Sequence, residues 1–255
     1  MVLSIILSVF ALMNFFFLLA VWKKNFGLVD IAWGQGFILI ALVSYFYHFN
    51  SVKNAVILFL VLLWGLRLSL YLLSRNWKAP EDHRYQDMRA EWGAHPNLHA
   101  YFKVFILQGV LMLLISLPIT AGMERAEPEL SLLNTLGVFI WISGWLFESY
   151  SDRYLKKYKA NPANKGTICM SGPWSISRFP NYFGEITLWY GIYLAAFTTS
   201  SWWTIIGPLT INFFILKVSG VPLLEKKYQK RPEYLEYANR VPRLIPFTRP
   251  KKVGP

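Results

Sequence analysis

The chain has 255 residues, of which 55% are hydrophobic and 17% aromatic, and its mean hydropathy is +0.34. These values exceed what a soluble domain needs, so they predict a polytopic membrane protein. The net charge of +12 does not indicate nucleic-acid binding, because the basic residues follow a membrane topology, and the single cysteine excludes an internal disulfide.

Apolar segments recur along the chain at about the length that a bilayer requires, roughly 20 residues for each helix. Pro118 and Pro208 lie inside two of these segments, where a kink or a neighbouring helix must satisfy the freed carbonyls. The prediction is an all-α fold, with about seven transmembrane helices in a single domain over residues 1–255. We expect spans near residues 2–22, 29–48, 54–74, 102–121, 131–150, 183–198 and 201–219.

The charges of the loops predict the orientation. Most of the 26 Lys and Arg residues lie in segments that share one side of the membrane if the N-terminus is outside. This asymmetry follows the positive-inside rule and predicts a cytoplasmic C-terminal tail. The first segment has no charged leading region or clear cleavage site, so we interpret it as a span. Short loops favour a bacterial inner membrane, although an endoplasmic-reticulum location demands the same pattern.

Polar side chains inside the predicted spans are costly in a bilayer and are therefore functional candidates. The alternative is that the acids pair with Arg67, Arg75 or lysines and only lock helices together. The candidates are four ionisable residues, Asp30, Arg67, Glu148 and Glu185, and two amides, Gln35 and Asn181.

Glu148, Asp152 and Lys156 recur at intervals of four residues and so share one helix face. Carboxylates accept hydrogen bonds from ribose or amide donors, and lysines bind phosphate oxygens, so this face suits a ligand with both groups. A surface ladder of salt bridges is the competing interpretation.

The loop "KKYKANPANKGTICMSGPWSISRFPNY" combines basic residues with glycines, which permit an anion to approach the backbone. It has no Rossmann or P-loop spacing, and binding of lipid headgroups is the alternative to a nucleotide. The four histidines are scattered, and His95 and His99 lack a third ligand, so no metal site is predicted.

A longer pattern extends over residues 161–185. "NPANKGTICMSGPWSISRFPNYFGE" resembles the signature of the steroid 5-alpha-reductase C-terminal-domain family, and most closely its bacterial and plant branch of unassigned substrate. The sterol C14- and C24-reductases share a related Arg-x-Pro-Asn-Tyr core. The segments "VDIAWGQGF", "LWGLRLSLYLLSRNW", "EDHRYQDMR", "FESYSDRYL" and "RPEYLEYANRVPRLIP" look like other blocks of the family.

This resemblance implies a seven-helix membrane reductase that uses NADPH to reduce a C=C bond of a lipid-like enone, such as a steroid. It implies that residues 1–121 are the substrate-side helices and residues 131–255 the cofactor-binding half. Asn181, Tyr182 and Glu185 match the nicotinamide and ribose end of the motif. The other cofactor positions implied are Arg67, Arg75, Glu148, Asp152, Lys156, Lys159, Asn164, Arg178 and Tyr228.

The chain departs from the steroid reductases in its second span. Those enzymes carry an adjacent Gln-Glu pair that is thought to polarise the substrate ketone, whereas here Gln35 precedes Gly36. We expect Asp30 to donate the proton with help from Gln35, and Glu185 is the second choice. We expect Trp33 and Trp64 to line the substrate site.

Two other functions remain open. Isoprenylcysteine-type methyltransferases, which bind S-adenosylmethionine, also have a small helical membrane fold with an Arg-x-Pro-x-Tyr turn. A non-catalytic lipid-binding relative is the third possibility. The partners expected are membrane lipids and a small-molecule lipid substrate, with no nucleic acid. The sequence does not indicate an oligomeric state.

Overall fold

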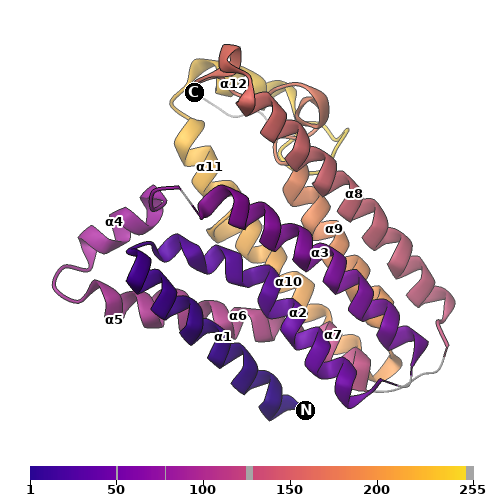
Figure 1. Ribbon diagram of the computed structural model, residues 1–255. Coiled ribbons are helices and arrows are strands. Elements are labelled where there is room, and N and C mark those ends of the chain that lie inside the picture. Colours follow the sequence, from indigo (N-terminus) through magenta and orange to yellow (C-terminus); the bar gives the residue numbers. More distant parts are fainter. Residues whose placement is uncertain (50, 78, 125–128, 251–255) are drawn as a thin grey trace. The chain divides into compact units, whose positions relative to one another are not determined.

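The computed structural model describes residues 1–49, 51–77, 79–124 and 129–250. All the regular elements within these ranges are helices (Figure 1). The chain divides into two compact units, one formed by residues 1–134 and 195–207 and the other by residues 135–194 and 208–255.

By length and composition, six helical stretches of the described chain are suited to cross a membrane. The predicted class, an all-α polytopic membrane protein, is therefore confirmed. The predicted span at 183–198 corresponds to α9, Pro180–Ala196, whose 17 residues are fewer than the roughly 20 of a straight crossing. The six stretches are Val2–Lys23, Phe26–Tyr47, Val52–Asn76, Pro96–Ile115, Leu132–Ala160 and Thr199–Tyr228.

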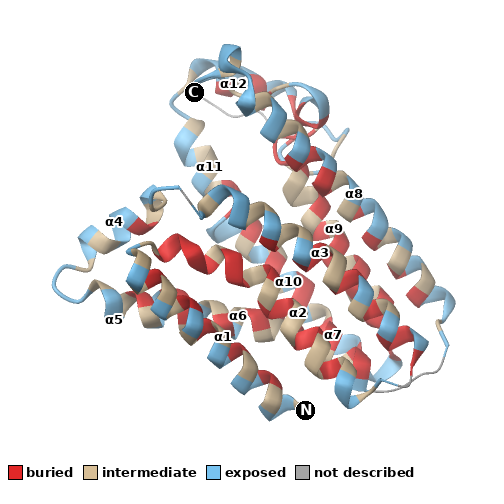
Figure 2. Ribbon diagram, in the orientation of Figure 1, coloured by how far each residue is buried: buried red, intermediate tan, exposed pale blue. Residues whose placement is uncertain are grey.

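In the first unit, α2 is the central helix. It packs against α1, α3, α6 and α7, and it is the most buried of the six stretches (Figure 2). A helix in this position needs apolar or small side chains all round, and α2 has them except at a few polar sites. The helices of this unit are α1 Val2–Lys23, η1 Phe26–Leu28, α2 Val29–Tyr47, α3 Val52–Asn76, α4 His83–Glu91, α5 Pro96–Ala100, η2 Tyr101–Ile106, α6 Leu107–Ile115, α7 Leu117–Glu124 and η5 Thr199–Ile205.

Side chains next to the helices define where several of them begin. Asn25 accepts a hydrogen bond from the Gly27 N–H at 3.0 Å at the start of η1. Asp82 accepts from the Arg84 N–H at 3.0 Å at the start of α4. Each cap satisfies a backbone donor that the first helical turn leaves without a partner.

The fourth predicted span, 102–121, is not one regular helix. It contains the π-helical turn η2, then α6, a break at Ser116, and α7. Pro118 lies in the first turn of α7, where its missing N–H disrupts no helical hydrogen bond. Pro208 likewise lies in the first turn of α10, Ile206–Phe213. Both prolines therefore lie in the first turn of a helix and not in a helix interior.

The second unit is built on two long neighbouring helices, α8 and α9. Helix α8, Leu132–Ala160, has 29 residues and extends well beyond the predicted span 131–150. It crosses α9 closely at Gly184, where an added Cβ would lie 2.6 Å from the Glu148 nitrogen. The other elements of this unit are η3 Pro162–Asn164, η4 Gly172–Ser175, α10 Ile206–Phe213, η6 Phe214–Val218, α11 Val221–Tyr228 and α12 Pro232–Arg240.

Candidate functional site

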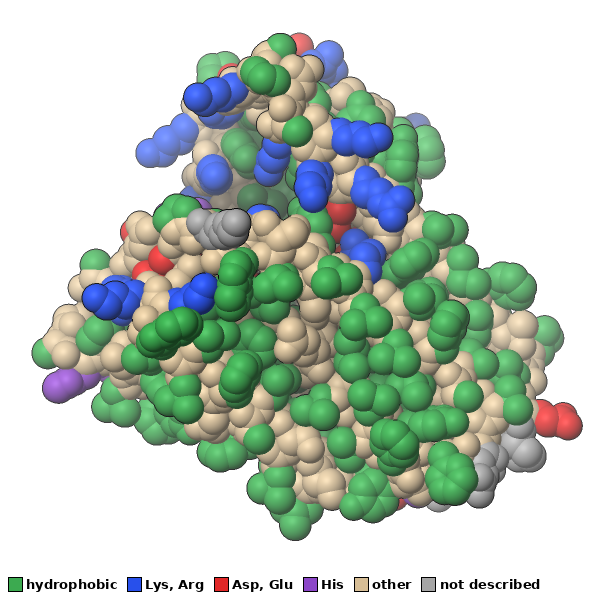
Figure 3. Space-filling model, in the orientation of Figure 1, with side chains coloured by type: hydrophobic (Ala, Val, Ile, Leu, Met, Phe, Trp, Pro, Cys, Tyr) green, Lys and Arg blue, Asp and Glu red, His purple; other side chains and the backbone are tan. Residues whose placement is uncertain are grey.

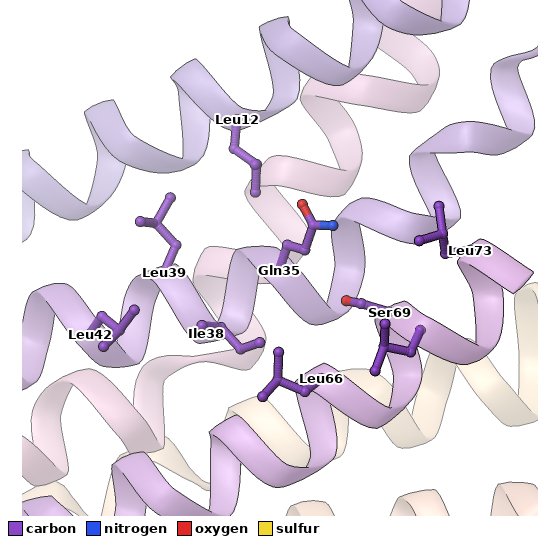
Figure 4. Close-up of a pocket in the computed structure, with 9 residues that line it drawn as sticks. Leu12, Gln35, Ile38, Leu39, Leu42, Leu66, Ser69 and Leu73 are labelled. Atoms are coloured by element: carbon purple, nitrogen blue, oxygen red, sulfur yellow. The ribbon is translucent and has the colours of Figure 1, made fainter. Parts of the chain in front are cut away.

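A cavity of about 430 Å³ lies between α1, α2 and α3 in the first unit (Figure 4). Its size falls in the range of small-molecule sites, roughly 300–1,000 Å³. The α3 side chains Leu66, Leu70 and Leu73 are 51%, 62% and 36% exposed, so this wall is accessible from outside the helices. The lining residues are Leu12, Gln35, Ile38, Leu39, Leu42, Leu66, Ser69, Leu70 and Leu73.

Gln35 is the main polar group of this cavity. Its side chain lies among the aliphatic lining residues from α1, α2 and α3 (Figure 4). Within the described part of the chain, no residue makes a hydrogen bond to its amide. Ser69 also lines the cavity, but its hydroxyl donates to the Ile31 carbonyl at 3.5 Å. The cavity therefore combines an apolar volume with one amide that is available to a ligand.

Trp33 and Trp64, predicted to line the substrate site, lie in a row of aromatic rings on α2 and α3. The Trp33 ring stacks on Phe37 at 5.7 Å, and Phe37 meets Trp64 edge-on at 5.5 Å. Trp64 is buried, and neither tryptophan lines the cavity. Their role in substrate binding stays a prediction.

Asp30, the predicted proton donor, interacts with two side chains of α4. The Tyr85 hydroxyl donates to Asp30 Oδ1 at 3.1 Å, and Arg84 Nη2 lies 3.6 Å from Asp30 Oδ2. Burial and the Asp30 charge raise the pKa of Tyr85 well above its ordinary value, so the hydroxyl keeps the proton that it donates. Asp30 therefore has two partners, and its catalytic role stays a prediction.

Two more residues connect the same segment to η1, directly before α2. Glu81 accepts a hydrogen bond from the Phe26 N–H at 2.7 Å and pairs with Arg89 at 3.0 Å. The Arg89 guanidinium lies 3.9 Å from the centre of the Phe26 ring. We call Glu81, Arg84, Tyr85 and Arg89 the α4 clasp.

The sequence pattern alone assigned no role to the α4 clasp. The available signal was the spacing of Glu81, Tyr85 and Arg89, which recur every four residues within "EDHRYQDMR". Their partners, Phe26 and Asp30, lie about 55 positions earlier, and spacing alone does not identify contacts at that distance.

In the second unit, α8 and α9 bring together the predicted carboxylate and amide. Asn181 Nδ2 donates to Asp152 Oδ1 at 3.3 Å. Glu148 lies one turn before Asp152 on α8, and both acids are buried. Gly184 permits this proximity, because its missing side chain allows α9 to approach the Glu148 backbone. Glu148, Asp152 and Asn181 therefore form a polar cluster where α8 and α9 cross.

Glu185 and Tyr182 lie on the same helix as Asn181. Glu185 is half-buried and follows Asn181 by four positions, so the two share a face of α9. The Tyr182 ring stacks on Phe179 at 5.9 Å. The expected contacts of both residues with a nicotinamide stay predictions.

Arg178, predicted to bind phosphate, has partners inside the protein. Its Nη1 donates to the Tyr234 hydroxyl at 3.1 Å and lies 3.2 Å from Glu225 Oε1. Glu225 pairs also with Arg243 at 2.7 Å. These contacts fasten the C-terminal helices to the loop before α9 and favour a structural role for Arg178.

The remaining predicted cofactor residues of this unit surround the same loop. Lys156 and Lys159 are exposed near the end of α8. Asn164 donates to the Tyr158 carbonyl at 3.0 Å and so holds the loop after α8. Tyr228 packs beside Tyr234, with ring centres 5.8 Å apart. Both lysine side chains are exposed, whereas Asn164 and Tyr228 have structural contacts.

Arg67 and Arg75 belong to the first unit. Arg67 is half-buried on α3. Arg75 is exposed near the end of that helix, where its Nε donates to Asn76 Oδ1 at 2.9 Å. The cofactor role of both arginines stays a prediction. Among the described residues, no three His, Cys, Asp or Glu side chains converge on a possible metal position.

These features define an all-α polytopic membrane protein with an apolar cavity in one unit and a buried carboxylate–amide cluster in the other. The chain belongs to the family described as "Protein of unknown function (DUF1295)", whose model matches residues 16–241. It is similar to "Uncharacterized protein C9.08c" of Schizosaccharomyces pombe, with 29% identity over 106 residues. That match covers 35% of this chain and 38% of the yeast protein, and no solved structure matches.

Proposed function

We propose that the protein is a membrane reductase that uses NADPH to reduce a C=C bond conjugated to a carbonyl in a lipid-like substrate. The observation that carries this proposal is the Gln35 amide, which has no hydrogen-bond partner among the described residues and lies in an otherwise aliphatic cavity. An aliphatic cavity suits a hydrocarbon skeleton, and an amide N–H suits a carbonyl oxygen.

The first unit would orient and polarise the substrate. Gln35 Nε2 would donate to the carbonyl oxygen, where negative charge develops during reduction; one such donor typically lowers a barrier by about 3–4 kcal/mol. Asp30 would provide the proton for the α-carbon when its carboxyl is protonated, and it would be left as the carboxylate to which Tyr85 donates. Tyr85 and Arg84, which contact both carboxylate oxygens, would orient it.

The second unit would bind the cofactor. Glu148, Asp152 and Asn181 offer buried acceptors and an amide for ribose hydroxyls and the carboxamide, so their chemistry fits that part of a dinucleotide. The exposed Lys156 and Lys159 fit its phosphates, whereas Arg178 is occupied by Glu225 and Tyr234. When bound, NADPH would supply the hydride.

We further propose that the protein lies in a bacterial inner membrane, with its N-terminus outside and its C-terminus in the cytoplasm. The concentration of Lys and Arg in alternate loops and in the tail supports this orientation. It would place the loop after α8 in the compartment that contains NADPH.

The test is NADPH oxidation by detergent-purified protein with a panel of lipid enones. We expect Gln35→Leu to lower kcat/KM by about 100-fold or more, as for removal of one donor to a developing oxyanion. Ser69→Ala is the matched control, because its hydroxyl is already bonded to Ile31. Equal rates for wild type and Gln35→Leu would contradict the proposal, and binding of S-adenosylmethionine without NADPH would favour a methyltransferase.

A further inference from the structure

Helix α11 is the last part of the membrane stretch Thr199–Tyr228. The part of this stretch that precedes α11, from Thr199 to Val218, makes about 20 positions, which is roughly enough to cross the hydrocarbon core. The helix is then interrupted at Gly220, where an added Cβ would lie 2.6 Å from the Ile215 carbonyl oxygen. The chain therefore enters α11, Val221–Tyr228, at the boundary of the membrane.

One face of α11 is basic and exposed. Leu223, Lys226 and Lys227 are spaced at i, i+3 and i+4, so they share a face of α11, and Lys230 follows in the turn after the helix. All four residues are exposed. We call these four residues the α11 lysine face. Lys and Arg side chains gather in the part of the surface that α11 and α12 occupy (Figure 3).

The acidic residue of α11 points to the protein interior. Glu225 pairs with the buried Arg178 at 3.2 Å and with Arg243 at 2.7 Å. Further along the tail, Glu233 pairs with Arg231 and Glu236 with Arg240. No acidic side chain of the described chain forms an ion pair with Lys226, Lys227 or Lys230.

We infer that the α11 lysine face binds the headgroups of anionic phospholipids at the membrane surface where α11 emerges. Clusters of basic residues directly after a membrane span are attracted to anionic lipid, and lysine ammonium groups donate hydrogen bonds to phosphate oxygens. Leu223, which is 39% exposed, adds an apolar contact on the same face. The inference is independent of the proposed reductase activity.

The positive-inside rule alone would account for how many positive charges lie on this side of the membrane, but not for where they lie on the surface. The distinction is testable, because other exposed basic residues follow the membrane part of α8. Arg153, Lys157 and Lys165 are exposed and match the three lysines in charge. A specific lipid site depends on the α11 lysines and not on these three.

The experiment measures retention of phosphatidylglycerol and phosphatidylcholine by purified protein, using native mass spectrometry over a lipid titration. Wild type is expected to bind phosphatidylglycerol at least tenfold more tightly than phosphatidylcholine. The triple variant K226Q/K227Q/K230Q is expected to lose about tenfold in affinity for phosphatidylglycerol only. The charge-matched control R153Q/K157Q/K165Q should stay within twofold of wild type.

A third variant, K226R/K227R/K230R, keeps the charge and should retain binding, which separates loss of the site from loss of the fold. Equal loss in the α11 and control triple variants would overturn the inference, because charge number would then be sufficient. Absence of a lipid preference in wild type would overturn it as well. Complete displacement of the lipid by an equimolar short single-stranded DNA would instead indicate a general polyanion site.

Discussion

Arg178 illustrates how one buried guanidinium can hold a whole segment. Its side chain is 5% exposed and contacts Glu225 and Tyr234, which lie on α11 and α12. Breaking a buried ion pair from one side leaves an uncompensated charge, which typically costs about 3–5 kcal/mol. We expect Arg178→Ala to release the C-terminal helices, so that limited proteolysis cleaves near Lys226 and Lys227 at least tenfold faster.

The control is Arg240→Ala, whose partner is Glu236. Both side chains of this pair are more than 60% exposed, and exposed pairs contribute at most about 1 kcal/mol. It should therefore leave the cleavage rate unchanged. If Arg178→Ala is cleaved like wild type but loses NADPH binding, the phosphate role predicted from the sequence is correct and the structural role is wrong.

Tyr85 connects the α4 clasp to α2 through Asp30. Its hydroxyl donates to the Asp30 carboxylate, and hydrogen bonds to charged groups contribute about 1.5–3 kcal/mol. We expect Tyr85→Phe to lower the free energy of unfolding of the first unit by about 2 kcal/mol at neutral pH. Chemical unfolding in detergent, followed by tryptophan fluorescence, measures this difference.

The pH dependence of that difference follows from the raised pKa of Tyr85. Burial and Asp30 raise it above its ordinary value of 10.0, so the unfolded chain loses this proton at a lower pH than the folded chain. The stabilisation is complete below pH 10 and decreases as the pH rises further. The difference in the free energy of unfolding between wild type and Tyr85→Phe should therefore become smaller above pH 10. A difference that grows above pH 10 would contradict the hydrogen bond from Tyr85 to Asp30.

At the scale of elements, the close crossing of α8 and α9 places Glu148, Asp152 and Asn181 together. An added side chain at Gly184 would meet backbone atoms of Glu148 and Gly144, which cannot move aside as a flexible side chain does. We expect Gly184→Val to separate the helices and to destabilise the protein by about 1–3 kcal/mol, the usual cost of overpacking.

The matched control for this crossing is Ser143→Val, on an exposed position of the partner helix α8. It should leave the melting temperature within a few degrees of wild type, whereas Gly184→Val should lower it. The same melting temperature for both variants would show that the crossing is looser than the structure indicates.

The helices were largely predictable because their apolar runs match the thickness of a bilayer. Their breaks were less predictable. Pro118 and Pro208 mark helix starts, which depend on the turn preceding each proline and not on the hydrophobic pattern. The 29-residue length of α8 was also underestimated, since its second half is polar and resembles a loop by composition.

Less of the candidate site was predictable. Spacing placed Glu148 and Asp152 on one face, and the structure adds Asn181 as a partner of Asp152. The engagement of Asp30 by Tyr85 and of Arg178 by Glu225 was not foreseen in detail, because each joins residues about 50 positions apart. Such pairings depend on how the helices pack and not on local pattern.

At the scale of the whole molecule, the distribution of basic residues predicts which loops face the cytoplasm. We expect a membrane-impermeant maleimide to label Phe49→Cys in intact cells and Lys165→Cys only after permeabilisation, both in a Cys169→Ser background. Phe49 and Lys165 are exposed, so access depends on the side of the membrane. The reverse labelling pattern would contradict the proposed orientation.

Isotope transfer tests most directly the proposal that hydride passes from a nicotinamide cofactor to a lipid. Purified protein is incubated with NADPH carrying deuterium at C4 and with a lipid extract of its own membranes, and the lipids are analysed by mass spectrometry. The account predicts a lipid that gains one deuterium and one solvent hydrogen, and loss of this product in Gln35→Leu. A cofactor that stays reduced while no lipid acquires the label would contradict it.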